Sequence, residues 1–463
     1  MANVQVNIQY IPNAQGGENL VHEEYKFRVK NRKAERVYWR CCIKGCPATL
    51  NTHQGFITKY SRNHNHVANP HKVAVDKFLV AMKTKVQEET KPVCAIYQEE
   101  VSALRSDRDS GEMIREIPTF YSCCASLYRA RAKILPALPQ TRNDIQLPDS
   151  YTKTTSGDDF LLHAAADSRF LVFSTQENLY HLANADTIYC DETFSMSPTL
   201  FTQIYTIHAF VHNKMFPLVY ALLPDKKEAT YVEFLRCVRD KTLALVNVNL
   251  NPGHVFTDFE VSMQNAVRTV LPRSELKGCF FHFGQCIWRN AQKYGLQADF
   301  SRVPEINKIV KQAAALPFIP IQQVEDVWLH ALDDAPLQDA RVLQFADYVT
   351  EFWVEGQHDR MMWNHFHTEG SRTTNHVEGW HSKITSIIAT PHPNIFKLVA
   401  FFKNEQAYSE VTILQLGANG KLRPKRRKYR QLETRLQTLK TDLQNGIKTV
   451  FEYADGVARL TTL

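Results

Sequence analysis

Hydrophobic and polar residues alternate with two different periods along the chain, and the period changes near residue 70. Within residues 10–70, the short stretches 25–29 and 36–40 alternate at every second position, which is typical of strands with one buried face. Aromatic residues, cysteines and histidines are frequent in the same region. The pattern predicts a small β module over residues 8–70 that a bound metal ion stabilises.

Helical periodicity follows the predicted β module. Hydrophobic residues recur at every third or fourth position over 73–82 and 94–104, and Pro118 is expected to open a third helix. Three short helices with a basic last one resemble a helix-turn-helix. The stretch 135–144 is punctuated by prolines, which predicts a linker at the end of a helical segment over residues 72–140.

Strands and helices alternate after residue 150. Strand-like stretches lie at 186–190, 202–211, 215–223, 254–256 and 276–281, and helix-like stretches lie at 229–245, 261–270 and 284–294. This order is typical of an α/β ribonuclease-H-like fold, in which helices flank one mixed sheet. From about 301 to 360 the periodicity is helical without strands, so we expect an all-helical insertion over about 296–370.

The region 411–463 begins with a basic run at 421–430. We interpret this run as a nuclear import signal or a phosphate-binding arm, with a charged surface loop as an equal alternative. An amphipathic helix is predicted after it, and we expect that helix to pack on its own domain. Four leucines lie at helical spacing along it: Leu432, Leu436, Leu439 and Leu443.

The composition is that of a soluble globular protein. The chain has 463 residues, of which 44% are hydrophobic, so it can bury a large core. We find no apolar stretch near the roughly 18 residues that a membrane span needs and no secretory signal at the start, so we expect no membrane association. In a reducing compartment the ten cysteines are expected to be thiols or metal ligands.

Positive charge is concentrated in the front of the chain. Residues 1–140 carry 21 Lys and Arg against 13 Asp and Glu, an excess of +8, whereas the net charge of the whole chain is +7. A basic front joined to a nearly neutral body suits a nucleic-acid partner, although many solvated surfaces are similarly uneven.

Two acidic residues follow predicted strands. Asp191 comes directly after the strand-like stretch 186–190, and Asp258 follows the strand-like stretch 254–256, in the sequence Val-Phe-Thr-Asp. Carboxyl ends of strands are where α/β sheets bind ligands, and carboxylates gathered there need a cation such as Mg²⁺ or Mn²⁺. A third carboxylate, Glu378, stands at the head of a helix-like segment and would complete a two-metal site. Taken singly, each acid is more often a helix cap or a loop residue.

The β module contains a possible zinc site. Cys41 and Cys46, followed after 17 residues by His64 and His66, supply two thiolates and two imidazoles for a tetrahedral Zn²⁺. Such an ion would be structural, because a module of this size has too little core to fold alone. Three further residues are weaker or competing candidates: Cys42, His53 and His71.

The sequence motifs around the three acids resemble the Mutator-like element (MULE) transposase domain over roughly residues 150–410. The shared motifs are Asp-Glu-Thr-Phe, Phe-Pro-Leu-Val-Tyr-Ala-Leu-Leu-Pro-Asp, Phe-Thr-Asp-Phe-Glu, Gly-Cys-Phe-Phe-His-Phe-Gly and Asn-His-Val-Glu-Gly-Trp-His. The resemblance implies an Asp-Asp-Glu transposase with catalytic Asp191, Asp258 and Glu378 and two Mg²⁺ or Mn²⁺ ions. The accessory residues that it marks, or that flank its last acid, are Cys279, His282, Asn375 and His381.

The front module resembles a FLYWCH zinc finger, and that similarity favours Cys41 over Cys42 as the ligand. It implies one structural Zn²⁺ and contact with double-stranded DNA, in which basic residues meet phosphates and an aromatic or arginine side chain reads bases. The residues that we expect to bind DNA, in the finger and in the third predicted helix, are Arg36, Arg40, Lys44, Lys59, Arg62, Arg129, Arg131 and Lys133.

The sequence thus predicts a nuclear DNA transposase that hydrolyses the phosphodiester at element ends and transfers the 3′-hydroxyl to target DNA. By analogy with other transposases, which join two DNA ends, we expect a homo-oligomer. The main alternative is a domesticated, non-catalytic DNA-binding protein such as a transcriptional regulator. A third hypothesis is a metal-dependent nuclease that cuts DNA without strand transfer.

Overall fold

The computed structural model of the chain divides into two compact units, Met1–Ala137 and Leu138–Leu463. The structure describes residues 8–13, 17–89, 91–105, 111–134, 136–164, 170–356, 358–368, 370, 372, 375–424 and 426–461, without the side chains of residues 375 and 376. Within those residues, no helix is both long and apolar enough to cross a membrane.

The first unit begins with a six-stranded antiparallel sheet in which each strand pairs with the next one in the sequence. Its inward side chains alternate along each strand, and Phe27, Trp39 and Leu50 form its core with the partly buried Tyr60. The strands are β1 (Gln9–Pro12), β2 (Glu18–His22), β3 (Tyr25–Lys33), β4 (Arg36–Cys41), β5 (Thr49–His53) and β6 (Phe56–Ser61).

Helices complete the first unit. They are α1 (Pro70–Glu88), α2 (Val93–Leu104), α3 (Gly111–Glu116) and α4 (Phe120–Ala132). Met82 and Val86 of α1 pack against Ile96 and Leu127 of the neighbouring helices. The sequence pattern missed α3, which has no buried residue and therefore no hydrophobic period to reveal it. The last helix begins at Phe120, after Thr119, rather than at Pro118.

The second unit contains a mixed seven-stranded sheet of order β13-β12-β9-β10-β11-β8-β7. The pairs β9–β12 and β12–β13 are parallel and the other pairs are antiparallel. The strands are β7 (Leu161–Ala164), β8 (Leu171–Phe173), β9 (Thr187–Thr193), β10 (Gln203–Val211), β11 (Lys214–Leu223), β12 (His254–Thr257) and β13 (Glu275–Gly278). β7 and β8 were not predicted from the sequence.

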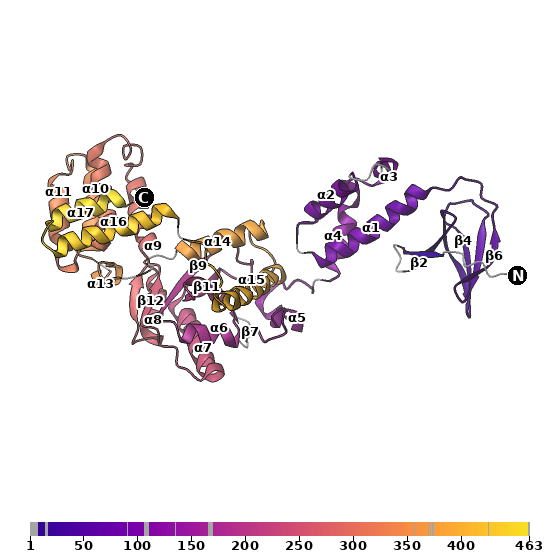
Figure 1. Cartoon of the computed structure of the whole chain (residues 1–463), viewed down its shortest axis with the longest axis horizontal. Coiled ribbons are helices and arrows are strands. Elements are labelled where there is room, and N and C mark those ends of the chain that lie inside the picture. Colours follow the sequence, from indigo (N-terminus) through magenta and orange to yellow (C-terminus); the bar gives the residue numbers. More distant parts are fainter. Residues whose placement is uncertain are drawn as a thin grey trace. The chain divides into compact units, whose positions relative to one another are not determined.

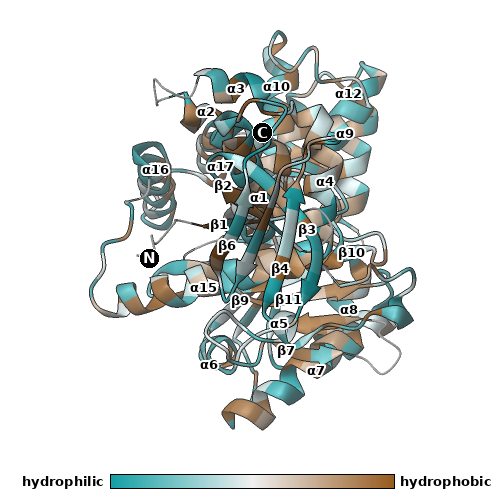
Figure 2. Cartoon of the chain, turned by 90° about the vertical axis from the view of Figure 1, so that its right-hand side faces the viewer, coloured by the Kyte–Doolittle hydropathy of each residue, from teal (hydrophilic) through white to brown (hydrophobic). Residues whose placement is uncertain are grey.

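Helices cover both faces of this sheet. Side chains of α6 (Gln176–Ala183), α7 (Glu228–Val246) and α8 (Val261–Val270) pack on one face, against core residues such as Ile188, Cys190 and Ile207. Figure 2 shows both hydrophobic and hydrophilic stretches on α7, as expected for a helix with one buried side. The opposite face carries α14 (Asn375–Ile388) and α15 (Ile395–Gly417), where Tyr220 stacks on Phe402. A mixed sheet between helices is consistent with a ribonuclease-H-like core.

One element boundary near the acids differs from the prediction. The sequence predicted a strand over 276–281, but β13 stops at Gly278 and α9 (Phe280–Lys293) follows. β13 is limited by its partner, because β12 ends at Thr257, opposite Gly278. The earlier start of α9 puts His282, which the prediction left between the strand and the helix, in the first turn of α9.

In the described residues after α9, the regular elements are all helices. It contains α10 (Pro304–Ala315), α11 (Val324–Asp333), α12 (Ala340–Val349), a π-helical turn (Thr350–Val354) and α13 (Arg360–Trp363). Two helices from the far end of the sequence, α16 (Arg427–Gln444) and α17 (Val450–Leu460), lie against these helices and share their core (Figure 1). The leucine spacing predicts the first of the two, whereas α17 was not predicted from the sequence. The remaining short helices are Arg142–Asp144, α5 (Asp149–Thr152), Leu316–Phe318 and Ile321–Gln323.

Candidate active site and zinc centre

Two adjacent parallel strands bring the first two predicted acids to the same end of the sheet. β9 and β12 run in parallel, and Asp258 follows β12 directly. Asp191 was expected after its strand but lies inside β9, because β10 continues to pair with β9 as far as Thr193. Both carboxylates therefore lie toward the carboxyl ends of neighbouring strands, the usual place for ligand-binding residues in such sheets.

α14 brings the third predicted acid to Asp191. Val377, Trp380 and Ile384 are buried on the side of the helix that faces the sheet, and Val377 packs against Tyr189 of β9. Glu378 lies in the first turn of α14, and residues three apart share one side of a helix, so His381 lies beside Glu378.

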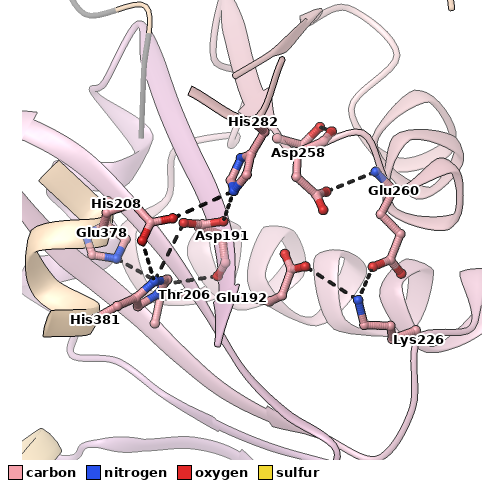
Figure 3. Close-up of polar contacts among 11 residues, drawn as sticks. Asp191, Glu192, Thr206, His208, Lys226, Asp258, Glu260, His282, Glu378 and His381 are labelled. Atoms are coloured by element: carbon pink, nitrogen blue, oxygen red, sulfur yellow. Dashed lines mark hydrogen bonds and ion pairs between the residues drawn. The ribbon is translucent and has the colours of Figure 1, made fainter. Parts of the chain in front are cut away.

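Two histidines flank the Asp191 and Glu378 carboxylates (Figure 3). The His381 Nδ1 lies 3.8 Å from Asp191 Oδ2 and 4.0 Å from Glu378 Oε2. The His282 Nε2 lies 3.9 Å from Asp191 Oδ1 and 3.7 Å from Glu378 Oε1. These separations are too long for hydrogen bonds, so the imidazoles surround the carboxylates without bonding to them.

The environment of Asp191 is unfavourable to a bare carboxylate. The residue is 2% exposed, and its buried Oδ2 has no hydrogen-bond partner. Burial and the nearby carboxylates of Glu192, Glu378 and Asp258 raise the pKa of Asp191 well above its usual range. Burial lowers the pKa of His282. Burial and the nearby His282 lower the pKa of His381 to about 4. Both imidazoles are therefore neutral near pH 7. The cluster thus lacks positive charge, and a bound cation would supply it.

A second acidic group lies on the other side of β9. Glu192, Asp258 and Glu260 have carboxylate oxygens within 4.8 Å of one another. The Lys226 ammonium lies 2.7 Å from Glu260 Oε2 and 3.5 Å from Glu192 Oε1 (Figure 3). It also lies over the Phe194 ring. Burial and the neighbouring Asp258 raise the pKa of Glu192 to about 8.

The structure therefore does not join the three predicted acids in one ligand group. Asp191 and Glu378 group with His381, whereas Asp258 groups with Glu192 and Glu260. Sequence reasoning missed the last two glutamates and Lys226. The sequence did contain an indication of Glu192. Adjacent residues of a strand point to opposite faces of the sheet, so Asp191 and Glu192 place one carboxylate on each face of β9.

The other predicted accessory residues differ in their surroundings. Cys279 is fully buried at the start of α9, and its backbone N–H donates to the Thr257 carbonyl. Asn375 begins α14, but its side chain lies outside the described residues. His208, which the sequence did not suggest, is buried on the same face as Asp191 and bonds to Thr206 Oγ1 at 2.9 Å.

The four predicted zinc ligands form a compact group at one end of the first sheet. Cys41 Sγ lies 3.2 Å from His66 Nε2, Cys46 Sγ lies 3.4 Å from His64 Nδ1, and the two imidazole nitrogens are 3.4 Å apart. Ligands arranged tetrahedrally around one Zn²⁺ are roughly 3.3–3.8 Å apart. The donor set and its spacing therefore fit a single structural zinc ion.

Neighbouring side chains hold this group in place. The Tyr25 ring stacks on His64 at 3.6 Å between centroids, and the Tyr60 hydroxyl lies 3.3 Å from His64 Nε2. Burial raises the pKa of the Cys41 thiol to about 11, so the thiolate needs a cation beside it. The competing candidates lie elsewhere: Cys42 is not in the group, His53 lies beside Glu35 and His71 beside Glu112.

Most of the basic residues predicted to bind DNA project from the finger. Arg36 and Arg40 alternate along β4 with the buried Trp39 and Cys41, so they lie on the outer face of the sheet. Arg28 stands directly opposite Arg40. Lys59 on β6 and Lys44 between the two cysteines are exposed, and Arg62 pairs with Glu23 at 2.7 Å.

The basic residues of α4 are in different situations. Arg129 and Lys133 are exposed. Arg131 is partly buried, and its guanidinium donates to the carbonyls of Val86 and Glu89 at 2.7 and 2.9 Å. Arg131 therefore satisfies the carboxyl end of α1, which is a structural role, and is not free for a phosphate.

Residues 187–285 match the MULE transposase domain. Residues 10–66 match the FLYWCH zinc finger domain, a span that contains all four zinc ligands. No curated protein matches the chain. The MULE transposase match includes Asp191, Asp258 and His282 and ends before Glu378, which a helical region of the chain separates from it. A transposase domain implies a DNA partner.

Proposed function

We propose that this protein is a DNA transposase of the Mutator-like type, with a ribonuclease-H-like core that hydrolyses phosphodiesters at element ends and transfers the strand to target DNA. The observation that carries the proposal is the buried, unpaired Asp191 Oδ2 beside Glu378, within a MULE transposase domain. Asp258 stands at the end of the adjacent parallel strand.

The acids would hold Mg²⁺ or Mn²⁺, with Asp191 and Glu378 in one ligand group and Asp258 in the other. Such ions lower the pKa of water and stabilise charge on phosphate oxygens. The protein contributes a buried acidic pocket whose neutral imidazoles add no positive charge. Divalent cations therefore bring the positive charge that a DNA phosphate needs in order to approach these carboxylates.

The finger would dock DNA. Its outer face carries Arg28, Arg36 and Arg40, which suit phosphates or guanine edges, and Tyr38 lies between the asparagines Asn31 and Asn51 on adjacent strands. We also propose a nuclear location, supported by the basic run at 421–430, and a homo-oligomer, since transposition joins two DNA ends.

DNA cleavage tests the catalytic part of this proposal. The full chain, incubated with DNA that carries the terminal repeats of its source element and with Mn²⁺, should release a 3′-hydroxyl end. Asp191→Asn should lose at least about 1,000-fold of this activity, because it removes a metal-binding charge. Asp240→Asn, a surface change beside Arg239, should retain activity. Equal activity of the wild type and Asp191→Asn would refute the assignment.

Zinc content and DNA binding test the finger. Cys46→Ser should lose the bound zinc and specific DNA binding, because metal binding supplies much of the folding free energy of so small a module. Cys42→Ser is the matched control, since Cys42 lies outside the ligand group. Zinc measured by atomic emission and DNA affinity measured by gel shift should separate the two variants. Unchanged zinc content in Cys46→Ser would exclude this site.

One observation favours a non-catalytic, domesticated DNA-binding protein as the second candidate. The Lys226 ammonium already lies between Glu192 and Glu260 in the Asp258 group, where an internal cation offsets charge that a metal would otherwise offset. A wild-type chain that binds DNA through the finger but gives no cleavage product in Mn²⁺ would support this candidate over the transposase.

A further inference from the structure

The ligand group around Asp191 contains a nitrogen donor. We infer that His381 is a direct metal ligand together with Asp191 and Glu378, and that this position selects a divalent transition-metal ion over Mg²⁺. The inference rests on the proposed function only in assuming that Asp191 binds a cation.

Geometry supports His381 as a ligand. Ligand atoms about 2.1 Å from one ion lie no more than about 4.2 Å apart. The His381 Nδ1 meets this limit toward both Asp191 Oδ2, at 3.8 Å, and Glu378 Oε2, at 4.0 Å. Both distances exceed hydrogen-bond length, so they leave room for an ion between the donors and are not explained by direct bonds.

Burial provides a second, independent observation. Asp191 is 2% exposed, and the oxygen that faces His381 has no hydrogen-bond partner. A buried carboxylate oxygen without a partner is unfavourable unless a cation or a hydrogen-bond donor satisfies it. His381 is the group beside this oxygen, its side chain is 12% exposed, and its Nδ1 points to the same space as Glu378 Oε2.

His282 occupies a different position. Its Nε2 approaches the other oxygen of each carboxylate, Asp191 Oδ1 and Glu378 Oε1. Within the described residues, the ligand atoms that lie mutually within 4.8 Å include His381 and not His282. His282 also lies on the side of Asp258 (Figure 3). We therefore assign His282 to the space between the two acidic groups rather than to the Asp191 ligand set.

The chemistry of the donors sets the metal preference. Mg²⁺ prefers all-oxygen surroundings and retains several waters, whereas imidazole nitrogen favours transition-metal ions. A set of two carboxylates and one imidazole should bind Mn²⁺ more tightly than Mg²⁺ by about tenfold or more. An all-oxygen set at the same place should lose that preference.

Pulsed electron paramagnetic resonance of Mn²⁺ bound to the full-length, zinc-loaded chain tests the inference. The wild type should show ¹⁴N coupling from one imidazole, and His381→Asn should abolish it. His282→Asn is the matched control and should keep it. His381→Asp should still bind Mn²⁺ without ¹⁴N coupling, and its Mn²⁺ to Mg²⁺ affinity ratio, measured by calorimetry, should fall about tenfold toward unity.

Retained Mn²⁺ binding in His381→Asp is a result that a misfolded variant does not give. Wild-type Mn²⁺ without ¹⁴N coupling, or coupling that survives His381→Asn, would overturn the inference. DNA cleavage is measured separately. A chain that shows the His381 coupling but cleaves nothing refutes the transposase activity alone, whereas a chain that cleaves DNA without the coupling refutes only the ligand assignment.

Discussion

Single buried polar residues determine much of the chemistry of this protein. His365 is 1% exposed and lies between the sheet and the helical region, where its Nε2 donates to the Gly278 carbonyl at 2.9 Å and its ring stacks on Phe256. Burial lowers the pKa of His365 to about 3. The unfolded chain, in which His365 is solvated, takes up this proton near pH 6.5.

This difference predicts a stability that depends on pH. Between about pH 6.5 and pH 3 the unfolded state binds one more proton than the folded state, so the contribution of His365 is fully present above pH 6.5 and is lost as the pH falls, by at most about 1.4 kcal/mol per unit. Urea unfolding at a series of pH values should show a smaller slope in His365→Gln, which keeps a donor for Gly278. His330→Gln, at an exposed position, should keep the wild-type slope.

Residue identity predicted the site only in part. The zinc ligands could be predicted because they are cysteines and histidines that lie close together in the sequence. The Asp191–Glu378 pair depended on motif resemblance, since 120 residues separate Glu378 from Asp258. The role of Arg131 could not be predicted, because a basic residue near a helix end gives no sign of whether its guanidinium meets solvent or the carbonyls of α1.

At the scale of elements, sequence periodicity predicted the helices and strands that bury a regular set of side chains. It missed short strands and element ends that depend on a partner. α7, α8, β10 and β11 agree with the predicted stretches because each buries a regular set of side chains. The end of β13 follows from the length of its partner β12, and a partner strand is not readable from one segment. β7 and β8 are only four and three residues long, too short for a clear period.

The junction of β13 and α9 gives an element-scale prediction. A Cβ on Gly278 would lie 2.5 Å from the Phe259 ring, so Gly278→Ala should destabilise the fold by about 1–3 kcal/mol. Gly379→Ala, inside α14, is a control of opposite sign. Among the described residues, no atom beyond its two chain neighbours and its own helix backbone lies within 4 Å of that Cβ, so alanine should stabilise the helix by about 0.5–1 kcal/mol. Chemical denaturation of both variants measures the difference. Equal loss in both would contradict the packing argument.

At the scale of the whole molecule, the helical region joins segments from distant parts of the chain. Tyr453 of α17 is fully buried, and its hydroxyl donates to the Phe318 carbonyl at 2.8 Å. Gly456 allows α16 to approach closely, since a Cβ there would lie 2.8 Å from Leu439. The predicted insertion is therefore not a self-contained unit, which the sequence pattern could not indicate.

Tyr453→Ala should lower the free energy of unfolding by about 3–5 kcal/mol, because it leaves a large cavity in this core. Tyr429→Ala, at a position that is 58% exposed, should change it by less than about 0.5 kcal/mol. Calorimetry gives the two values, and limited proteolysis should locate the new cleavages of Tyr453→Ala in residues 296–370. A mild effect of Tyr453→Ala would show that α17 is dispensable to the core.

The shared core of α10 and α17 has a consequence for synthesis on the ribosome. Tyr453 follows Phe318 by 135 residues, so α10, α11 and α12 emerge long before the helices that cover them. At a translation rate of roughly 5–20 residues per second, the apolar faces of these helices stay exposed for at least several seconds. During that interval the nascent chain exposes apolar surface that favours aggregation, and the Asp191 site stays incomplete until Glu378 has also been made.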